Sequence, residues 1–411
     1  MLDVRFHDIL LSPRPDRVLA RQFIPEGGRL EDLISRVSEL SEQDAVAAVA
    51  SARALSEPRH RDVSAIWAGN AAAVPVDVSH LSPAHLELLG ALLTCEYAIE
   101  GAALTNPSAV PLRHRPDGGV DFVMSARAIG EGHVSSLVFA TGSAFPDPTS
   151  GELRVSLEER PRYVSAGVCS DVGDGYKVTF RGVPLPERVI FPHAAAEANG
   201  IEDARFVAFT ERVTPRFAAT YTAYDGHRIS GRLLTTDDFC TFFSIPLTGP
   251  GAANKGVALF PRRITGSWLA VTRTDGVSMG LAESDNLYHW GEPAPLYTPR
   301  LPWEIYQGGN CGSPIETPQG WLLITHGVGP MRHYSIGAIL LERDDPSKVR
   351  AILRSPLIFP HPGQRDGYVP NVVYTCGVLE VGGQLLIPYG LADCRIGFAS
   401  VAIADLLSEM G

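Results

Sequence analysis

The feature that most constrains the fold is a long run of short, strand-like segments between about residue 99 and residue 411. Apolar and polar residues alternate within them, as in VDFVMSARAI (120–129), HVSSLVFATG (133–142) and GQLLIPYGLAD (383–393). Turn signals such as PDGG, YDG, TDG, PQG and EVGG separate the segments at intervals close to the length of a strand. No convincing long helix interrupts this pattern, which is typical of an all-β sandwich, barrel or propeller.

Two segments of this region hint at an internal repeat, LLTTDDF (233–239) and LAESDNLYHWG (281–291). Each follows a strand-like run and carries Ser or Thr, an Asp and a nearby aromatic residue. Four-stranded sheets repeated around an axis would produce this pattern, with the turn Asp capping each blade. At about 60–65 residues per blade the region holds five blades, so we expect an all-β, five-bladed β-propeller.

The first hundred residues have a helical pattern instead. Residues 28–40 carry apolar side chains at three- and four-residue spacing, and Ser41 suits the N-cap of a second helix. Ser82 followed by Pro83 marks the start of a third, and residues 70–79 suit a linker. We therefore predict an N-terminal helical extension over residues 1–98 and a catalytic propeller domain over residues 99–411.

Charge and hydropathy exclude two classes of partner. The 411 residues carry a formal net charge of −11, which disfavours binding to nucleic acid or to an anionic membrane surface. No stretch approaches the ~20 apolar residues that span a bilayer. Acidic residues break the apolar run of the N-terminus, which therefore does not resemble a signal peptide. These features predict a cytoplasmic protein.

Cysteine and histidine spacing predicts neither a disulfide framework nor a metal site. The six cysteines are far apart, no CxxC occurs, and we expect reduced, mostly buried thiols. His326 and His333 are the histidine pair most similar to metal ligands, but no carboxylate pattern accompanies them. We expect no metal and no cofactor.

Several polar residues interrupt the strand-like runs, where a functional site would be built. Glu202 and Asp203 stand beside Arg205 before the strand FVAFT, where one carboxylate could be a general acid and the other reading is a surface turn with an ion pair. Further polar residues at strand ends are Asn106, Arg127 and Asp393. A dispersed basic set, also at strand ends, could hold an anion or be ordinary surface cations: Lys255, Arg273 and His326.

These residues belong to a series of motifs that, in this order, resembles glycoside hydrolase family 130, the β-mannoside phosphorylases and β-mannosidases. The resemblance covers roughly residues 95–411. Its motifs are Asn106-Pro107, the strand ending at Arg127, IEDAR (201–205), LFP (259–261), the strand ending at Arg273, the SD-x-L-x-x-W segment (284–290), GWLLITHGV (320–328), the Y-x-x-GA element at Tyr334, YVPNVVYTCG (368–377) and YGLAD (389–393).

The resemblance implies a five-bladed propeller that cleaves short β-mannosides with inversion. It implies that Asp203 is the acid, protonating the leaving oxygen through a sugar hydroxyl in the phosphorylases. It also implies that Asn106, Arg127 and Asp393 bind the mannose at the cleaved bond. Ala204 stands where the family usually has proline, which puts the local backbone in question but not the acid.

Phosphorolysis and hydrolysis differ in what the site must supply. An inverting hydrolase needs a second carboxylate as base, whereas phosphate is already an anion and needs cations to hold it. The resemblance places the phosphate cations at Lys255, Arg273 and His326, but a family lysine falls on Gln307. Nearby substitutes for the lost charge are Arg332 and His333.

We therefore expect phosphorolysis to α-mannose 1-phosphate with inorganic phosphate as co-substrate, and a β-mannosidase as the alternative. A hydrolase would need a base, for which the candidates are Glu316 and Asp366. The resemblance places Gln364 where relatives carry a glutamate. A carbohydrate-binding propeller without catalysis is a third reading. The expected partner is a small mannose-containing oligosaccharide, β-1,2-linked or joined to glucose or N-acetylglucosamine, with a homo-oligomer formed through the N-terminal helices.

Overall fold

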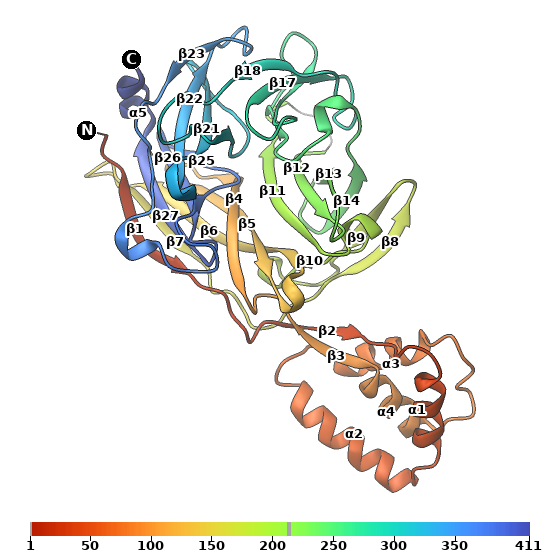
Figure 1. Ribbon diagram of the computed structural model, residues 1–411. Helices are drawn as coiled ribbons and strands as arrows, with labels where there is room; N and C mark the ends of the chain where they lie inside the picture. Colours follow the sequence, from red (N-terminus) through yellow and green to blue (C-terminus); the bar gives the residue numbers. More distant parts are fainter. Residues whose placement is uncertain (1, 212–214) are drawn as a thin grey trace. The chain divides into compact units, whose positions relative to one another are not determined.

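The computed structural model describes residues 2–211 and 215–411, which form two compact units (Figure 1). The β unit comprises Met1–Pro13, Glu100–Arg160 and Ala166–Gly411. The helical unit comprises Arg14–Ile99 together with Pro161–Ser165. Among the described residues, no helix is both long enough and apolar enough to cross a bilayer.

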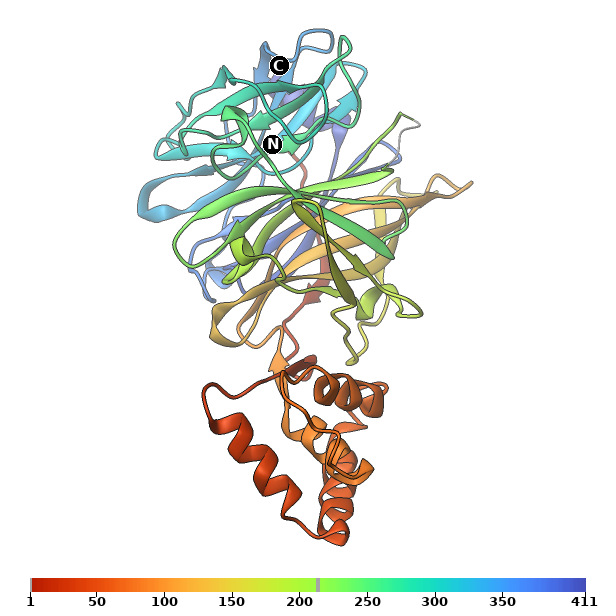
Figure 2. The same cartoon turned by 90° about the vertical axis from the view of Figure 1, so that its right-hand side faces the viewer.

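Four helices and a two-stranded ribbon form the helical unit, drawn in red and orange in Figure 2. They are α1 (Arg29–Ser38), α2 (Glu42–Ser56), α3 (Val63–Ala72), α4 (Pro83–Leu92) and the antiparallel strands β2 (Val18–Gln22) and β3 (Thr94–Ala98). The predicted caps of α2 and α4 are confirmed: the Ser41 hydroxyl accepts a hydrogen bond from the backbone N–H of Asp44, and the Ser82 hydroxyl from that of His85.

Helix α3 was not predicted, and it overlaps the segment 70–79 that we expected to be a linker. Its sequence VSAIWAGNAA is apolar on nearly all sides, so no periodic stripe marks it as a helix. Val63 and Trp67 nevertheless bury their side chains in the core of the unit, against Val49 and Leu88. Tertiary packing, rather than a local pattern, holds this helix in place.

The described residues of the β unit form four sheets. The first, ordered β1-β27-β26-β24 with β25 beside β26, is made of β1 (Arg5–Leu11), β24 (Val373–Tyr374), β25 (Leu379–Val381), β26 (Gln384–Leu391) and β27 (Arg395–Ala402). The third is made of β15 (Ala258–Leu259), β16 (Trp268–Thr272), β17 (Met279–Ser284) and β18 (Ala294–Tyr297). The fourth is made of β19 (Gln307–Asn310), β20 (Ile315–Thr317), β21 (Gly320–Val328), β22 (Tyr334–Leu341) and β23 (Val349–Ile352). Helix α5 (Ile403–Met410) follows β27.

The second sheet is by far the largest, with eleven strands in the order β4-β5-β6-β11-β12-β13-β14-β9-β8 and with β7 and β10 beside β6. Its strands are β4 (Ala103–His114), β5 (Val120–Ile129), β6 (Ser135–Pro146), β7 (Leu153–Leu157), β8 (Val168–Val172), β9 (Gly175–Thr179), β10 (Val189–Ile190), β11 (Gly200–Ala208), β12 (Phe217–Tyr224), β13 (Ile229–Thr236) and β14 (Thr241–Pro246). A parallel contact between Gly200 and Ser135 joins β11 to β6 and so fuses two groups of strands into one sheet.

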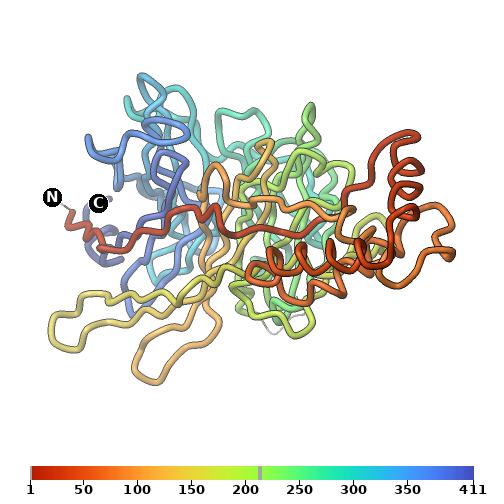
Figure 3. Tube along the Cα trace, turned by 90° about the horizontal axis from the view of Figure 1, so that it is seen from below, coloured from red at the N-terminus to blue at the C-terminus, as the bar shows by residue number. Residues whose placement is uncertain are grey.

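The prediction of a five-bladed β-propeller with an N-terminal helical extension is wrong. Eleven strands share one sheet instead of forming separate four-stranded blades, and in the described part of the chain every sheet runs between two edge strands without closing. The chain also starts with a strand: β1 pairs antiparallel with β27, with Arg5 opposite Ser400. Figure 3 shows this red N-terminal strand beside the blue C-terminal segment. The spacing of turn signals sets strand lengths, but it does not determine which strands pair.

The two repeated segments do form equivalent turns. In the first, Asp238 Oδ1 accepts hydrogen bonds from the backbone N–H of Cys240 (2.8 Å) and Thr241 (3.0 Å). In the second, Asn286 Oδ1 accepts them from the N–H of Tyr288 (3.2 Å) and His289 (2.9 Å). The next residue has positive φ in both turns, 56° at Phe239 and 69° at Leu287. The capping residue of the second turn is therefore an asparagine rather than the expected aspartate.

Candidate active site

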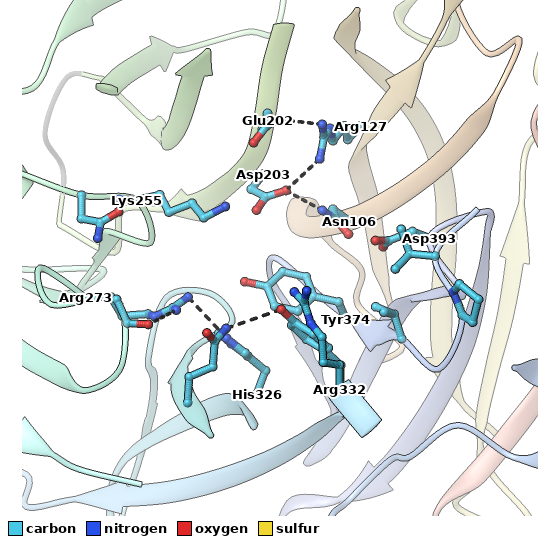
Figure 4. Close-up of a pocket in the computed structure, with 17 residues that line it drawn as sticks. Asn106, Arg127, Glu202, Asp203, Lys255, Arg273, His326, Arg332, Tyr374 and Asp393 are labelled. Atoms are coloured by element: carbon cyan, nitrogen blue, oxygen red, sulfur yellow. Dashed lines mark hydrogen bonds and ion pairs between the residues drawn. The ribbon is translucent and has the colours of Figure 1, made fainter. Parts of the chain in front are cut away.

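All seven predicted site residues line one pocket of the β unit, with a volume of about 620 Å³ (Figure 4). They are Asn106, Arg127, Asp203, Lys255, Arg273, His326 and Asp393. All four sheets of the β unit contribute to the lining. The large sheet supplies the first three residues, Arg273 directly follows β16, His326 lies in β21, and the sheet of β24–β27 supplies Tyr374 from β24. The structure thus brings together residues that are up to 287 positions apart in the sequence (106 to 393).

Three of these residues have a backbone that glycine would favour. Asn106 (φ 50°) lies in a register break of β4 and Asp203 (φ 53°) in a register break of β11. Asp393 (φ 47°) follows Ala392 (φ 48°) in the tight turn between β26 and β27. Such a conformation costs a non-glycine residue roughly 1–3 kcal/mol. Bulges and strained turns of this kind redirect a side chain, and here all three side chains enter the pocket.

Asp203 is held from three sides. Its Oδ1 accepts a hydrogen bond from Nδ2 of Asn106 at 2.5 Å and lies 4.0 Å from the Arg127 guanidinium. Its Oδ2 lies 3.8 Å from Arg205. Arg127 in turn donates to Glu202 at 2.7 Å. The alternative interpretation of this segment as a surface turn is therefore excluded, because the carboxylate faces the pocket with only 13% of its side chain exposed.

Arg205 is a buried arginine that contacts the backbone of Asp203. Its side chain is 2% exposed, and it donates to the backbone carbonyl of Asp203 and to the hydroxyl of Tyr374, both at 2.8 Å. The same guanidinium therefore fixes the strained peptide of Asp203 and the ring of Tyr374, which also lines the pocket. The sequence predicted Arg205 only as a neighbour of the two carboxylates and Tyr374 only as part of a motif.

Opposing influences set the pKa of Asp203. Burial acts to raise it, but the charges of Arg205, Arg127 and Lys255 and the hydrogen bond from Asn106 outweigh burial and hold the pKa below its ordinary value. Asp203 is therefore ionised at neutral pH in the free protein. Asp393 differs: burial raises its pKa to about 6, although the hydroxyl of Thr105 donates to its Oδ1 at 3.0 Å.

The basic residues lie across the pocket from Asn106 (Figure 4). Arg273 is 7% exposed; one of its terminal nitrogens lies 3.4 Å from Nε2 of His326 and the other donates to the Gly276 carbonyl at 2.9 Å. Lys255 is exposed and forms no ion pair among the described residues, and its backbone N–H donates to Asn254.

His326 does not carry the charge that the sequence analysis assigned to it. Burial first, and then the charges of Arg273 and Arg205, lower the pKa of His326 well below its ordinary value. The ring is therefore neutral at pH 7 and offers hydrogen bonding only. It lies edge-on to Tyr374 (4.9 Å between centroids) and parallel to Tyr334 (6.1 Å).

Gln307 also lines the pocket as a neutral group, with Nε2 3.5 Å from the hydroxyl of Tyr334. Arg332 lines it too, whereas His333 does not. Pocket residues without a predicted role are Asn254, Gly276, Tyr334, Val369, Pro370, Val372 and Tyr374. Their only sequence signal was proximity to a predicted residue or membership of a motif.

The carboxylates considered as bases for hydrolysis lie outside the pocket lining. Glu316 pairs with Arg262 at 2.7 Å and lies 3.6 Å from Arg343, and the hydrogen bond from Arg262 lowers its pKa. Asp366 and Gln364 are also absent from the lining. Within the residues that the structure describes, no three His, Cys, Asp or Glu side chains form a metal-binding group, and all six cysteines are free.

Comparison with known proteins identifies one family. A family model described as beta-1,4-mannooligosaccharide phosphorylase matches residues 170–410. The 1,2-beta-oligomannan phosphorylase of Thermoanaerobacter sp. (strain X514) is 32% identical over 245 residues, which cover 56% of this chain and 79% of that protein. A Beta-1,2-mannobiose phosphorylase of the same organism is 32% identical over 256 residues, which cover 59% of this chain and 79% of that protein.

A solved structure supports the same relationship at the level of the fold. The Beta-1,2-Mannobiose phosphorylase from Listeria innocua superposes with a TM-score of 0.54 at 21% identity, covering 76% of this chain and 93% of that one. The family model alone spans more than half of the sequence, from the β8 strand to the C-terminal helix. The chain therefore belongs to glycoside hydrolase family 130.

Proposed function

We propose that this protein is a β-mannoside phosphorylase, which cleaves short β-mannosides with inorganic phosphate and releases α-mannose 1-phosphate. The observation that carries the proposal is the division of one pocket into two sides. Asp203, Asn106, Arg127 and Asp393 form a side rich in hydrogen-bonding groups, and Lys255 and Arg273 form a cationic side. The named relatives of the chain are phosphorylases as well.

The polar side suits a sugar. Carboxylates and an amide offer directed hydrogen bonds to hydroxyl groups, and Asn106 and Asp393 are already oriented by Thr105, whose hydroxyl lies 3.0 Å from both side chains. The cationic side suits phosphate, because Lys255 and Arg273 can place the nucleophile in line with the anomeric carbon and offset its charge. His326 adds a neutral hydrogen-bonding group there.

The reaction moves one proton. Hydrogen phosphate attacks the anomeric carbon, the glycosidic bond breaks, and the proton of the nucleophile ends on the leaving oxygen. An ionised Asp203 is compatible with this balance, because it can accept the proton of the hydrogen phosphate dianion and then transfer that proton to the leaving oxygen. Phosphate bound near Lys255 also offsets the positive charge that keeps the Asp203 pKa low, so binding raises the pKa of the acid.

Hydrolysis has less support. An inverting hydrolase needs a base at roughly 6.5–9.5 Å from the acid, with water between them. Glu316 is committed to Arg262 and lies outside the pocket lining. Within the pocket, Glu202 is committed to Arg127 at 2.7 Å. A phosphate nucleophile requires neither group as a base.

The substrate that we propose is a mannobiose or short mannooligosaccharide. The two named relatives act on β-1,2-linked mannans, and the family model carries a β-1,4 description, so both linkages belong in the assay. We further propose a cytoplasmic location, where a sugar phosphate is retained, and a homo-oligomer formed through the helical unit. The support for the oligomer is apolar exposure on α2, where Leu55 is 76% and Val46 is 53% exposed.

The proposal is tested by the phosphate dependence of the initial rate on β-1,2- and β-1,4-mannobiose. The wild type should have a saturable requirement for phosphate. Arg273→Lys should raise the phosphate KM about tenfold or more, because lysine loses the forked donor geometry. Arg350→Lys, on the outer strand β23, is the matched control and should leave the KM unchanged. A wild-type rate independent of phosphate would contradict the proposal.

A further inference from the structure

Arg332 is a cation of the pocket that no described protein group holds. The pocket contains three arginines. Arg127 is paired with Glu202 at 2.7 Å, and Arg273 donates to the Gly276 carbonyl while facing His326. Among the described residues, Arg332 forms no hydrogen bond or ion pair, so its guanidinium retains its full set of donors.

The backbone directs this side chain into the pocket. Arg332 lies in the short turn Pro330–Arg332 between β21 and β22, closed by a hydrogen bond from the Gly329 N–H to the His333 carbonyl at 3.0 Å. Both central residues have positive φ, 58° at Met331 and 53° at Arg332. Met331 is 82% exposed. Arg332 is exposed as well, but it lines the pocket, where Figure 4 labels it together with Tyr374.

The loop between β5 and β6 has the same backbone geometry as the turn that carries Arg332. The comparison shows that the Arg332 turn keeps this geometry at a cost in conformational energy. Between β5 and β6, the Gly130 N–H bonds the Val134 carbonyl at 3.0 Å, as Gly329 bonds His333. There the two central residues are Gly132 (φ 65°) and His133 (φ 61°). The β21–β22 loop keeps the same conformation with methionine in place of glycine, at a cost of about 1–2 kcal/mol. Strain retained at a pocket rim points to a function.

The position of the turn assigns Arg332 to the cationic side of the pocket. It connects β21, which carries His326, to β22, which begins at Tyr334. Tyr334 is parallel to His326 and lies 3.5 Å from the Gln307 amide, and both of these groups are neutral. Lys255 and Arg273 alone would have to match the two charges of hydrogen phosphate, and Arg273 has already committed donors to protein groups.

We propose that Arg332 is a phosphate-binding residue, which supplies the charged fork for the oxygens of inorganic phosphate near Gln307. This inference rests on the proposed function for its substrate. A guanidinium binds an oxyanion through paired, charge-assisted hydrogen bonds that a neutral sugar hydroxyl cannot match. The carboxylates on the sugar side already have partners, so they leave Arg332 free for the incoming anion.

The test measures binding of inorganic phosphate to the full chain without sugar, from the rise of the melting temperature with phosphate at constant ionic strength. Arg332→Gln should weaken phosphate binding about tenfold or more, since a hydrogen bond to a charged group contributes ~1.5–3 kcal/mol. Arg332→Lys should recover part of the affinity. Arg350→Gln, a matched surface change, should bind phosphate as the wild type does.

Steady-state kinetics on a mannobiose complete the test. The phosphate KM of Arg332→Gln should rise about tenfold while the KM for the sugar stays within about twofold. Unchanged phosphate binding in Arg332→Gln, a rise in the sugar KM alone, or a wild type that does not bind phosphate would overturn the role of Arg332. A wild type that binds phosphate through Arg332 but releases free mannose at a phosphate-independent rate would overturn only the proposed function.

Discussion

Three pocket residues, Asn106, Asp203 and Asp393, have a left-handed backbone conformation that their local sequence does not predict. The segments TNP, EDA and LAD contain no glycine. Their residue types were predictable, because polar side chains interrupt apolar runs at strand ends. Their conformation was not, because it arises from register breaks and a tight turn that depend on pairing with distant strands.

At this scale the first prediction concerns the acid. Asp203→Asn removes the group that transfers the proton and should lower kcat at least ~10²-fold. The fold should persist, because an asparagine can still face Asn106 and Arg127. Activity is measured together with the melting temperature. Asp366→Asn, outside the pocket lining, is the control and should retain normal turnover. Near-normal turnover of Asp203→Asn would remove this residue from the role.

The second prediction concerns the pH dependence of stability. Because burial raises the pKa of Asp393 to about 6, the folded protein binds a proton more tightly there than the unfolded chain does. The stability that this bound proton gives the folded protein is fully present below the ordinary pKa of a carboxyl group. It declines as the pH rises and is lost above a pH of about 6.

The side chain introduced by Asp393→Asn is neutral at every pH, so the stability of this variant should not decline with pH at this position. The variant should therefore gain roughly 2 kcal/mol of unfolding free energy over the wild type between pH 4.5 and pH 7.5. Denaturant unfolding at the two pH values measures the gain. A difference between variant and wild type that does not change with pH would show that Asp393 does not titrate as described.

At the scale of elements, the repeated turns after β13 and β17 connect a sequence pattern to a structure. Asp238 and Asn286 accept equivalent pairs of backbone hydrogen bonds. Asp238→Ala should reduce the unfolding free energy by about 1–2 kcal/mol, because two N–H groups lose their acceptor. Asp238→Asn should change it by less than about 0.5 kcal/mol, because Asn286 performs the same task. Equal effects of the two substitutions would contradict this account.

The sequence predicted individual helices and strands but not the way in which the strands pair into sheets. Alternation and turn residues predicted strands such as β5, β6 and β26, and serine caps predicted α2 and α4. The assembly into sheets was not predictable, because the contact of β6 with β11 joins Ser135 to Gly200 across 65 residues. The seven predicted site residues nevertheless line one pocket, and each lies at or near the end or break of a strand.

At the scale of the whole molecule, the helical unit is inserted into the β unit through paired strands. Val18 of β2 is opposite Ala98 of β3. In the part of the chain that the structure describes, the members of four hydrophobic core clusters of the β unit all lie outside residues 19–97. Replacing Leu19–Tyr97 by Asn-Gly should therefore close a hairpin and leave a folded β unit with kcat/KM within about threefold of the wild type.

Removing all residues before 99 is the contrasting deletion. It also removes β1, which leaves β27 as an exposed edge, and should reduce solubility and stability. The mass of the hairpin variant in solution reports whether the helical unit holds an oligomer together. Loss of folding in the hairpin variant, with folding kept in the longer truncation, would contradict the division of the chain into these units.

The most direct test of the central claim is the identity and configuration of the product, followed by ³¹P and ¹H NMR. The wild type is incubated with β-1,2- or β-1,4-mannobiose, with and without inorganic phosphate. The account predicts α-mannose 1-phosphate and free mannose in equal amounts, formed only when phosphate is present. Mannose alone, at the same rate without phosphate, would contradict it and would require a water-activating carboxylate in the pocket.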